Sequence, residues 1–261
     1  MRKKEEATGI CVPDRVKVKS LYKAIQLLFY FTEEERELGI TEIAEKSGLL
    51  KSSVHNMLST YEECGLVRRN PDTNKYHLGE RVLELSNHFY RNNDIRQVAK
   101  PYMVELANRT NESVFLAVSS GTEVIYLDGA FPETSVGGRN MTGLKAPKYC
   151  TGIGKAILAY ETEQCVKEVI EEGMVAFTDQ TITDGKRLQE ELEKIRERGY
   201  AIDQMEHEYG VKCVAVPIRN AENRVVAAYS ITGPSPRFTK ERIEELEGLL
   251  KQYANIIKPR L

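Results

Sequence analysis

The feature of the sequence that most restricts the fold is a series of short helical patterns and a basic hairpin between residues 40 and 78. "ITEIAEKSG" is typical of a short helix capped by Thr41 and closed by Gly48. After a tight turn, "LLKSSVHNMLSTYEECG" predicts a second helix that ends at Gly65. "LVRRNPDTNKYHL" then indicates two strands joined by a Pro-Asp-Thr-Asn turn. Together these elements predict a winged helix-turn-helix.

A further helix is predicted ahead of this series, from "SLYKAIQLLFYF" with Ser20 as its N-cap. Its apolar residues recur at helical spacing, and we expect them to form a buried face: Leu21, Ala24, Ile25, Leu28 and Phe31. Residues 1–14 precede it and contain basic residues without the apolar run of a signal peptide. We therefore predict a disordered tail over 1–14 and a cytoplasmic protein.

The second helix of the winged unit separates its residues onto two faces. Val54, Met57, Leu58 and Tyr61 form the apolar face, whereas the opposite face carries small hydrogen-bonding residues. An α-helix fits the major groove of double-stranded DNA, and side chains near its N-terminus reach base edges. We predict contacts to DNA from the helix and, through phosphates or an adjacent minor groove, from the wing: Lys51, Ser52, Ser53, His55, Asn56, Arg68, Arg69 and Lys75. Taken singly, the two arginines and His55 could be ordinary exposed residues.

The rest of the chain is predicted to be a separate α+β domain. The winged unit covers residues 15–79, a linker helix covers 80–93, and the polar stretch "RNND" marks the boundary to a domain over 94–261. In that domain strand patterns such as "SVFLAV", "VKCVAVPIR" and "VVAAYSIT" are interrupted by two charged helices and followed by a last helix. This order favours an antiparallel sheet covered by helices.

Alternation along these strands predicts a pocket. "VVAAYSIT" has no strongly polar face and is expected to be a central strand, with Ser230 and Thr232 on the face that carries small residues. Asp203 and Cys213 on the neighbouring strands are also polar tips among small apolar residues, which is typical of a small-molecule pocket. The alternative is that the hydroxyls satisfy backbone groups and Cys213 is a small buried residue.

The stretch "CTGIGKA", residues 150–156, resembles the end of a phosphate-binding loop but lacks its first glycine and the hydroxyl residue after the lysine. We instead expect Gly152 and Gly154 to turn the chain into a helix whose first N–H groups receive a carboxylate. Lys155 would then lie on the protein surface.

Several chemistries are not favoured by the composition. The net charge of −2 does not indicate DNA binding by itself, so charge must be placed locally, and no apolar run is long enough for a membrane span. The five cysteines are odd in number and widely spread, which predicts reduced thiols. Cys150, His207 and Cys213 lack the spacing of metal ligands, and no catalytic grouping is evident, so we predict no metal, no cofactor and no enzyme activity.

Motifs in both domains occur in an order that resembles the IclR family of bacterial transcriptional regulators: "GLLKSSVHNMLSTYEECGLV", "YHLGERVLELS", "CTGIGKAILA", "TITD", "IRERGYAID" and "GVKCVAVPIRNAENRVVAAYSITGPSPRFT". The resemblance implies a winged helix, a linker helix and a GAF-like effector-binding domain, assembled as a homodimer or a dimer of dimers. It also implies a small organic acid as effector, held by residues that include those from strand alternation: Ala146, Gly152, Ile153, Asp203, Cys213, Ser230 and Thr232.

The sequence departs from this family in places. Leu50 stands where a proline usually opens the recognition helix, and Thr232 stands for a serine. Lys145, Lys148 and Tyr149 stand where arginine, leucine and histidine are more common. These changes border the pocket, so no individual member's ligand is transferred.

The predicted function is a ligand-responsive regulator, a repressor of a catabolic operon. An effector that binds two dimer geometries unequally shifts their populations and the spacing of the winged helices on an inverted-repeat operator. Two alternatives stay open. One is a GAF-type cysteine redox sensor or enzyme using Cys213 or Cys150, and the other is a DNA-binding scaffold with a vestigial pocket.

Overall fold

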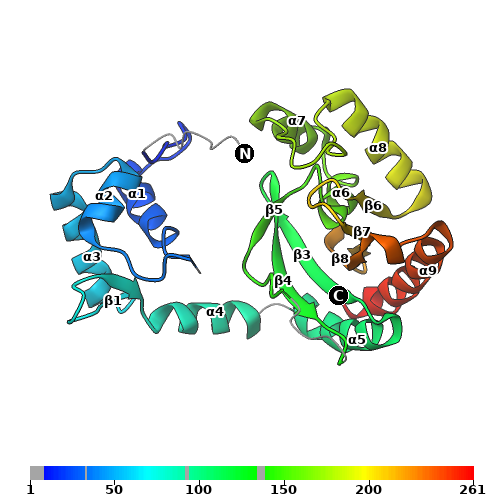
Figure 1. Ribbon diagram of the computed structural model, residues 1–261, viewed down its shortest axis with the longest axis horizontal. Coiled ribbons are helices and arrows are strands. Elements are labelled where there is room, and N and C mark those ends of the chain that lie inside the picture. The colour runs from blue at the N-terminus through cyan, green and yellow to red at the C-terminus, as the bar shows by residue number, and fades with distance from the viewer. Residues whose placement is uncertain (1–8, 33, 92–93, 134–138) are drawn as a thin grey trace. The chain divides into compact units, whose positions relative to one another are not determined.

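The computed structural model describes residues 9–32, 34–91, 94–133 and 139–261, and it divides into two compact units, 1–92 and 93–261 (Figure 1). Each unit has its own hydrophobic core. The unit over 1–92 contains α1 Lys19–Leu28, α2 Ile40–Ser47, α3 Lys51–Glu63, β1 Val67–Arg69, β2 Tyr76–Leu78 and α4 Arg81–Arg91. The winged helix-turn-helix order predicted from the sequence is confirmed.

The turn between α2 and α3 is fixed by backbone conformation. Gly48 closes α2 in the left-handed region at φ 68°. Leu50 is extended and serves as the N-cap of α3, so the helix starts at Lys51 without the proline. The cap of α2 differs from the prediction. It is Gly39 rather than Thr41, and the Glu42 carboxylate accepts a hydrogen bond from the Gly39 N–H at 2.6 Å.

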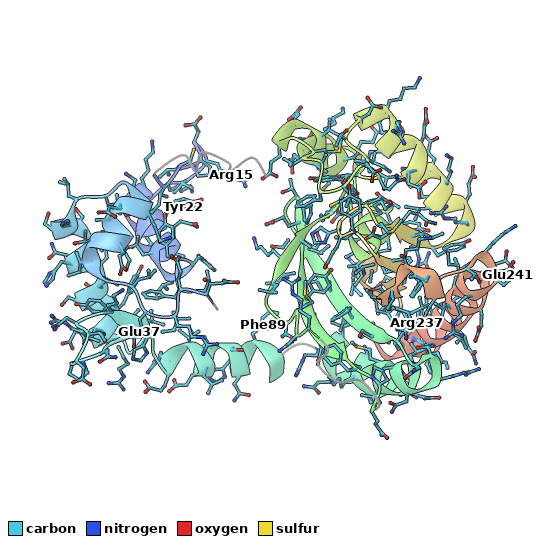
Figure 2. All side chains as sticks on the ribbon, viewed as in Figure 1. Arg15, Tyr22, Glu37, Phe89, Arg237 and Glu241 are labelled. Carbon is cyan, nitrogen blue, oxygen red and sulfur yellow. The ribbon has the colours of Figure 1, made fainter. Side chains whose placement is uncertain are left out.

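The wing is an antiparallel hairpin attached to the segment ahead of α2. Arg68 pairs with His77 across β1 and β2, and Leu38 forms a bridge to Tyr76. The Glu37 carboxylate, labelled in Figure 2, accepts a hydrogen bond from the Asn70 amide at 2.9 Å. The hairpin is therefore held in place by the residues before α2 as well as by its own turn.

The helix α1 packs differently from the sequence prediction. Leu27 is fully buried, whereas Leu21 is 57% and Ile25 is 43% exposed, so the predicted buried face is wrong at those two positions. The helix is apolar on more than one side, and periodicity alone does not tell which side meets α2 and α3. Its N-cap is Val18 rather than Ser20.

Within the predicted disordered tail, the Ile10 N–H donates to the Ser47 carbonyl at 3.0 Å. Residues 1–8 of that predicted tail lie outside the described residues.

The unit over 93–261 is built on a sheet in the order β5-β4-β3-β8-β7-β6, with every neighbouring pair antiparallel. Its strands are β3 Ser113–Ser120, β4 Glu123–Ala130, β5 Lys145–Pro147, β6 Ala201–Gln204, β7 Val211–Arg219 and β8 Val225–Pro234. Its helices are α5 Asp94–Thr110, α6 Gly152–Leu158, α7 Glu163–Glu172, α8 Gly185–Arg198, η1 Ser235–Arg237, α9 Lys240–Ile257 and η2 Lys258–Arg260. As predicted, β8 is a central strand.

The two faces of this sheet carry different layers. One face packs on α5 and α9 (Figure 1), where Ala227, Tyr229 and Ile231 of β8 enter the larger core and the Tyr229 hydroxyl donates to the Leu250 carbonyl. The other face packs on α6 and α8 and carries the second core of this unit, with Ala228 from β8. The alternation of β8 therefore separates structural residues from those that meet α6 and the candidate site.

Candidate functional site

Four strands place polar side chains in one row across the sheet. Asp203 on β6 pairs with Cys213 on β7, Cys213 pairs with Thr232 on β8, and Thr232 pairs with Ser113 on β3. Directly paired residues of neighbouring strands point to the same face. Ser230 belongs to the adjacent row, and its hydroxyl lies 3.3 Å from that of Thr232. The sequence predicted all of these side chains except Ser113.

A cavity of about 520 Å³ lies over this row. Six of the seven residues predicted to bind an effector line it: Gly152, Ile153, Asp203, Cys213, Ser230 and Thr232. The seventh, Ala146, does not: it is buried on β5 opposite Val124 in the core. The size suits a small organic molecule.

Other cavity residues were not singled out by the sequence analysis. Phe115 and Tyr126 stand on β3 and β4, and their rings are 5.8 Å apart in an edge-to-face arrangement. Strand alternation in "SVFLAV" and "TEVIYLD" is the signal that could have assigned them. Others come from loops, for which periodicity gives no signal, and from the cap of α6; they include Arg139, Met141, Leu144, Thr151 and Glu208. His207, which the sequence analysis considered only as a metal ligand, also lines the cavity.

The two glycines of "CTGIGKA" are required by close packing. A Cβ atom on Gly152 would lie 2.5 Å from the Cys213 sulfur, and one on Gly154 would lie 2.5 Å from the Lys148 Cα. Real Cβ atoms do not approach other atoms so closely, so α6 can rest directly on the sheet only with glycine here. The glycines thus bring the start of α6 to the cavity wall.

The start of α6 is partly used by its own cap. Thr151 is the N-cap, and its hydroxyl oxygen accepts a hydrogen bond from the Gly154 N–H at 3.1 Å. The same hydroxyl donates to the Pro147 carbonyl at 2.8 Å. The helix has only seven residues, so the predicted carboxylate site at its N–H groups is weaker than expected.

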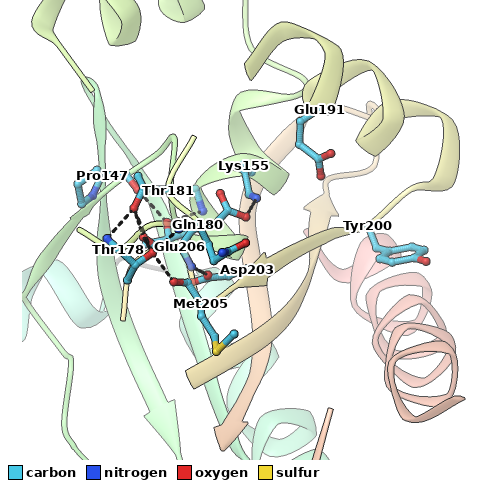
Figure 3. Close-up of polar contacts among 12 residues, drawn as sticks. Pro147, Lys155, Thr178, Gln180, Thr181, Glu191, Tyr200, Asp203, Met205 and Glu206 are labelled. Carbon is cyan, nitrogen blue, oxygen red and sulfur yellow. Dashed lines mark hydrogen bonds and ion pairs between the residues drawn. The ribbon is translucent and has the colours of Figure 1, made fainter. Parts of the chain in front are cut away.

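Lys155 is not on the surface, which corrects the sequence prediction. It is 1% exposed and its ammonium pairs with the Glu206 carboxylate, which is itself 5% exposed (Figure 3). The Asp203 carboxylate accepts a hydrogen bond from the Glu206 N–H at 2.7 Å. The Lys155 ammonium is therefore paired with Glu206, and its charge also favours the ionised form of Asp203, the carboxylate that faces the cavity.

The turn that carries Glu206 is held from a second side. Met205 lies in the left-handed region at φ 65°. The Thr178 hydroxyl donates to the Met205 carbonyl at 2.7 Å, and the Thr181 hydroxyl donates to the Glu206 carbonyl (Figure 3). The segment after α7 thus fixes the turn between β6 and β7 beside the cavity.

Burial governs the ionisation of the site. It raises the pKa of Asp203 to about 7, although Lys155 and the Glu206 N–H act in the opposite direction. Burial raises the pKa of the Cys213 thiol to about 12 and holds that of Cys150 well above its usual range. It also lowers the pKa of His207. Both thiols are therefore protonated and weakly nucleophilic at neutral pH.

The predicted DNA-binding residues of α3 are accessible. Lys51, Ser52, His55 and Asn56 are exposed, and Ser53 is half-buried. Lys51 has no ion-pair partner among the described residues. This polar face at the N-terminal half of α3 is what recognition in the major groove requires.

The wing cations have partners within the unit. Arg68 pairs with Glu80 at 2.9 Å, and Arg69 donates to the Asn74 side chain at 2.9 Å. Lys75 pairs at 2.8 Å with Glu42. That carboxylate also accepts the Gly39 N–H, so Lys75 has a structural role that the sequence did not suggest.

Two further findings concern the residues that the structure describes. In those ranges no group of three His, Cys, Asp or Glu side chains is arranged to hold a metal ion. None of their helices is long and apolar enough to cross a membrane.

Comparison with known proteins assigns both units. The IclR helix-turn-helix domain matches residues 20–71, and the bacterial transcriptional regulator IclR C-terminal domain matches residues 87–258. The chain belongs to the IclR family. It is therefore a transcriptional regulator, and its winged unit is the helix-turn-helix part that binds DNA.

Individual relatives agree with this assignment. The transcriptional regulator XynR of Escherichia coli K12 is 34% identical over 236 residues, which is 90% of this chain and 94% of XynR. The transcriptional repressor IclR of the same organism is 29% identical over 245 residues, 93% of this chain and 89% of that protein. The crystal structure of the Thermotoga maritima IclR has a TM-score of 0.70 at 36% identity, covering 91% of this chain and 96% of its own.

Proposed function

We propose that this IclR-family chain is a repressor of a catabolic operon that binds an inverted-repeat operator as a homodimer and responds to a small organic acid in the cavity beside Asp203. The observation that carries the proposal is that one chain contains both an exposed polar face on α3 and a cavity of about 520 Å³. Six of the seven residues predicted to bind an effector line that cavity. A relative named as a transcriptional repressor supports the direction of regulation. A regulator that reads DNA acts in the cytoplasm of a bacterial cell.

The homodimer is supported by apolar residues exposed on single helices. Leu83 is 72%, Leu85 is 58% and Phe89 is 52% exposed on α4, where Phe89 is labelled in Figure 2. On α1, Leu21 and Ile25 are also exposed. Leu85 and Phe89 are four positions apart and share one side of α4, as Leu21 and Ile25 do on α1, whereas Leu83 lies on another side of α4. Exposed apolar pairs of this kind mark interaction surfaces, and two symmetric subunits match a two-fold symmetric operator. A dimer of dimers would place two such pairs on one operator.

The alternative use of Cys213 or Cys150 as a redox or catalytic thiol is not favoured by the site. Reaction requires a thiolate, and burial raises the pKa of both thiols. Alkylation rates of the full chain measured against pH distinguish the two functions: a half-maximal rate below pH 7 would support the thiol function. We expect the rate at these two positions to stay low up to pH 9.

The experiment that tests the regulator is a DNA shift and footprint assay on the region upstream of the chain's own gene, repeated at several salt concentrations. We expect specific, salt-sensitive binding to an inverted repeat. Asn56→Ala on the exposed face of α3 should weaken binding by about tenfold to a hundredfold, because one base contact contributes ~1–3 kcal/mol.

The matched control is Glu62→Ala, an exposed position at the other end of α3, which should leave DNA affinity unchanged. Absence of any specific complex would overturn the proposed function. Light scattering on wild type and Phe89→Glu tests the dimer in the same preparations, and a wild-type monomer would refute that part.

A further inference from the structure

The cavity beside Asp203 is lined by a buried carboxyl group and by exposed cationic side chains. Its deep end is the cross-strand row, where Asp203 is 7% exposed and contributes the carboxylate of the lining. Its rim includes Arg139, which is exposed, and Lys145, whose side chain is half exposed. A ligand that fills such a cavity must present a different group to each end.

The deep end has an excess of acid. Asp203 and Glu206 are both buried, and Lys155 on α6 is the cation that pairs with Glu206 in the turn after β6. One oxygen of Glu206 is buried and has no hydrogen-bond partner among the described residues, and Lys155, which pairs with Glu206, leaves Asp203 without an ion-pair partner of its own among them. The titratable groups that face Asp203 from the elements packed against it are Lys155 on α6, Cys150 ahead of it, Cys213 on β7, Tyr126 on β4, and Glu206 and His207 in the turn. A ligand carboxylate placed here would add another acid to a poorly solvated site.

The same end offers hydrogen-bond acceptors. Besides the Asp203 carboxylate, the hydroxyls of Ser113, Ser230 and Thr232 face the cavity from β3 and β8. At the start of α6 the Gly154 N–H is already bonded to Thr151, and the helix has only seven residues, so its attraction for an anion is weak. A donor group such as a hydroxyl or an ammonium is therefore the complement of the floor.

The rim and the middle of the cavity define the rest of the ligand. Burial lowers the pKa of His207, and the charges of Glu208 and Arg139 then act on it in opposite directions, Glu208 raising it and Arg139 lowering it, so both charged groups lie near that ring at the rim. Lys145 is 3.2 Å from Glu123, a partner outside the cavity. Between rim and floor the lining is apolar: Phe115, Tyr126, Met141, Leu144, Ile153 and Val211.

We infer, on the basis of the proposed function, that the effector is a carboxylic acid with a hydrogen-bond donor at its far end, bound with the donor on Asp203 and the carboxylate toward Arg139. This orientation satisfies both ends of the cavity and leaves a hydrocarbon or aromatic body against the apolar lining. The reverse orientation would place two carboxylates together at the floor.

The test compares acids of one length that differ only in the distal group, by calorimetric titration of the full chain. The linear series is hexanoate, 6-hydroxyhexanoate, 6-aminohexanoate and adipate. The aromatic series is 4-methylbenzoate, 4-(hydroxymethyl)benzoate, 4-(aminomethyl)benzoate and terephthalate. In at least one series we expect the acid that carries the distal hydroxyl or amino group to bind about tenfold tighter than the parent acid. This is the effect of one hydrogen bond to a charged group. The diacid should bind no tighter than the parent.

Variants assign the two ends. Asp203→Asn keeps an acceptor for the Glu206 N–H and removes the charge, so the diacid should gain at least about tenfold, while the preference for an amino group should disappear. Arg139→Gln should weaken all the acids by a similar factor without changing their order. Circular dichroism on both variants confirms that the fold is retained.

Three outcomes would overturn the inference: a diacid or parent acid that binds as tightly as the donor-bearing acids, an order of affinities unchanged in Asp203→Asn, or no binding in either series. The operator shift assay on the same preparations separates these results from failure of the proposed function. Operator binding without the expected order refutes only the ligand class, whereas loss of operator binding refutes the regulator.

Discussion

The buried pair of Lys155 and Glu206 gives the sharpest test of how the unit over 93–261 is held together. Lys155→Met removes the charge but keeps most of the volume, and it leaves Glu206 buried without its cation and Asp203 without its nearby one. Both partners of the pair are at most 5% exposed, so solvent screening does little to reduce the effect. Breaking a buried pair on one side costs about 3–5 kcal/mol of unfolding free energy.

The double variant Lys155→Met/Glu206→Leu should recover most of that loss. Replacing both members of a buried pair by apolar residues of similar size removes the desolvation penalty of each, and such replacements are often neutral. We expect the double variant to lie within about 2 kcal/mol of wild type. The matched control is Lys145→Met, which breaks a half-exposed pair with Glu123 in the same unit and should cost less than about 1 kcal/mol.

The assay is urea denaturation followed by circular dichroism, with hydrogen exchange in β7 and β8 to assign the transition to residues 93–261. The loss in Lys155→Met should be smaller at pH 5 than at pH 8. Without the lysine, the folded state favours protonated Glu206 and Asp203, so it binds more protons than the unfolded chain and its stability falls as pH rises. A loss below about 1 kcal/mol, or one that grows toward low pH, would refute the electrostatic reasoning.

Three further predictions concern the cavity and its wall. Gly152→Val should lower the melting temperature of the unit over 93–261, because its Cβ would lie 2.5 Å from the Cys213 sulfur; calorimetry showing an unchanged transition would contradict this packing. The pKa of Asp203 is raised from 3.8 to about 7 on folding, so its contribution to the unfolding free energy falls by up to ~1.4 kcal/mol per pH unit between pH 4 and 7. Urea midpoints of Asp203→Asn should lack that decline, and a slope equal to wild type would refute it. Phe115→Ala should abolish the binding of any acid of either series while leaving the DNA shift unchanged, since it removes an aromatic wall of the cavity; retained binding would exclude that wall from the site.

The elements predicted best from the sequence are those with a strong local signal. Gly48 and the apolar spacing of α3 determine the turn and the helix without help from distant residues. Alternation in β8 identified both its central position and the face that meets the cavity, because a strand's period of two residues is independent of its neighbours.

The errors occur where distant residues decide the outcome. Lys155 follows a glycine in a short helix and gives no local sign of burial, since its partner Glu206 is 51 positions away in the chain. The strand β5 has only three residues and lies in a glycine-rich stretch, too short for a periodic pattern. Arg139 comes to the rim from the same stretch. For Leu21 and Ile25 the pattern indicated a helix but not the side of it that is buried.

The polar row under the cavity also has a consequence for the order in which the two units fold during synthesis. Ser113 and Thr232 are direct neighbours on the sheet, although more than a hundred residues of chain separate them. Closing so long a loop is slow, because its entropy cost is offset only when β8 has formed its hydrogen bonds between β3 and β7. During synthesis the winged unit is therefore complete well before the cavity over the sheet exists. A nonsense mutation anywhere between the end of α4 and β8 would leave a DNA-binding fragment that no effector can release, and such alleles should act as dominant, uninducible repressors beside the intact gene.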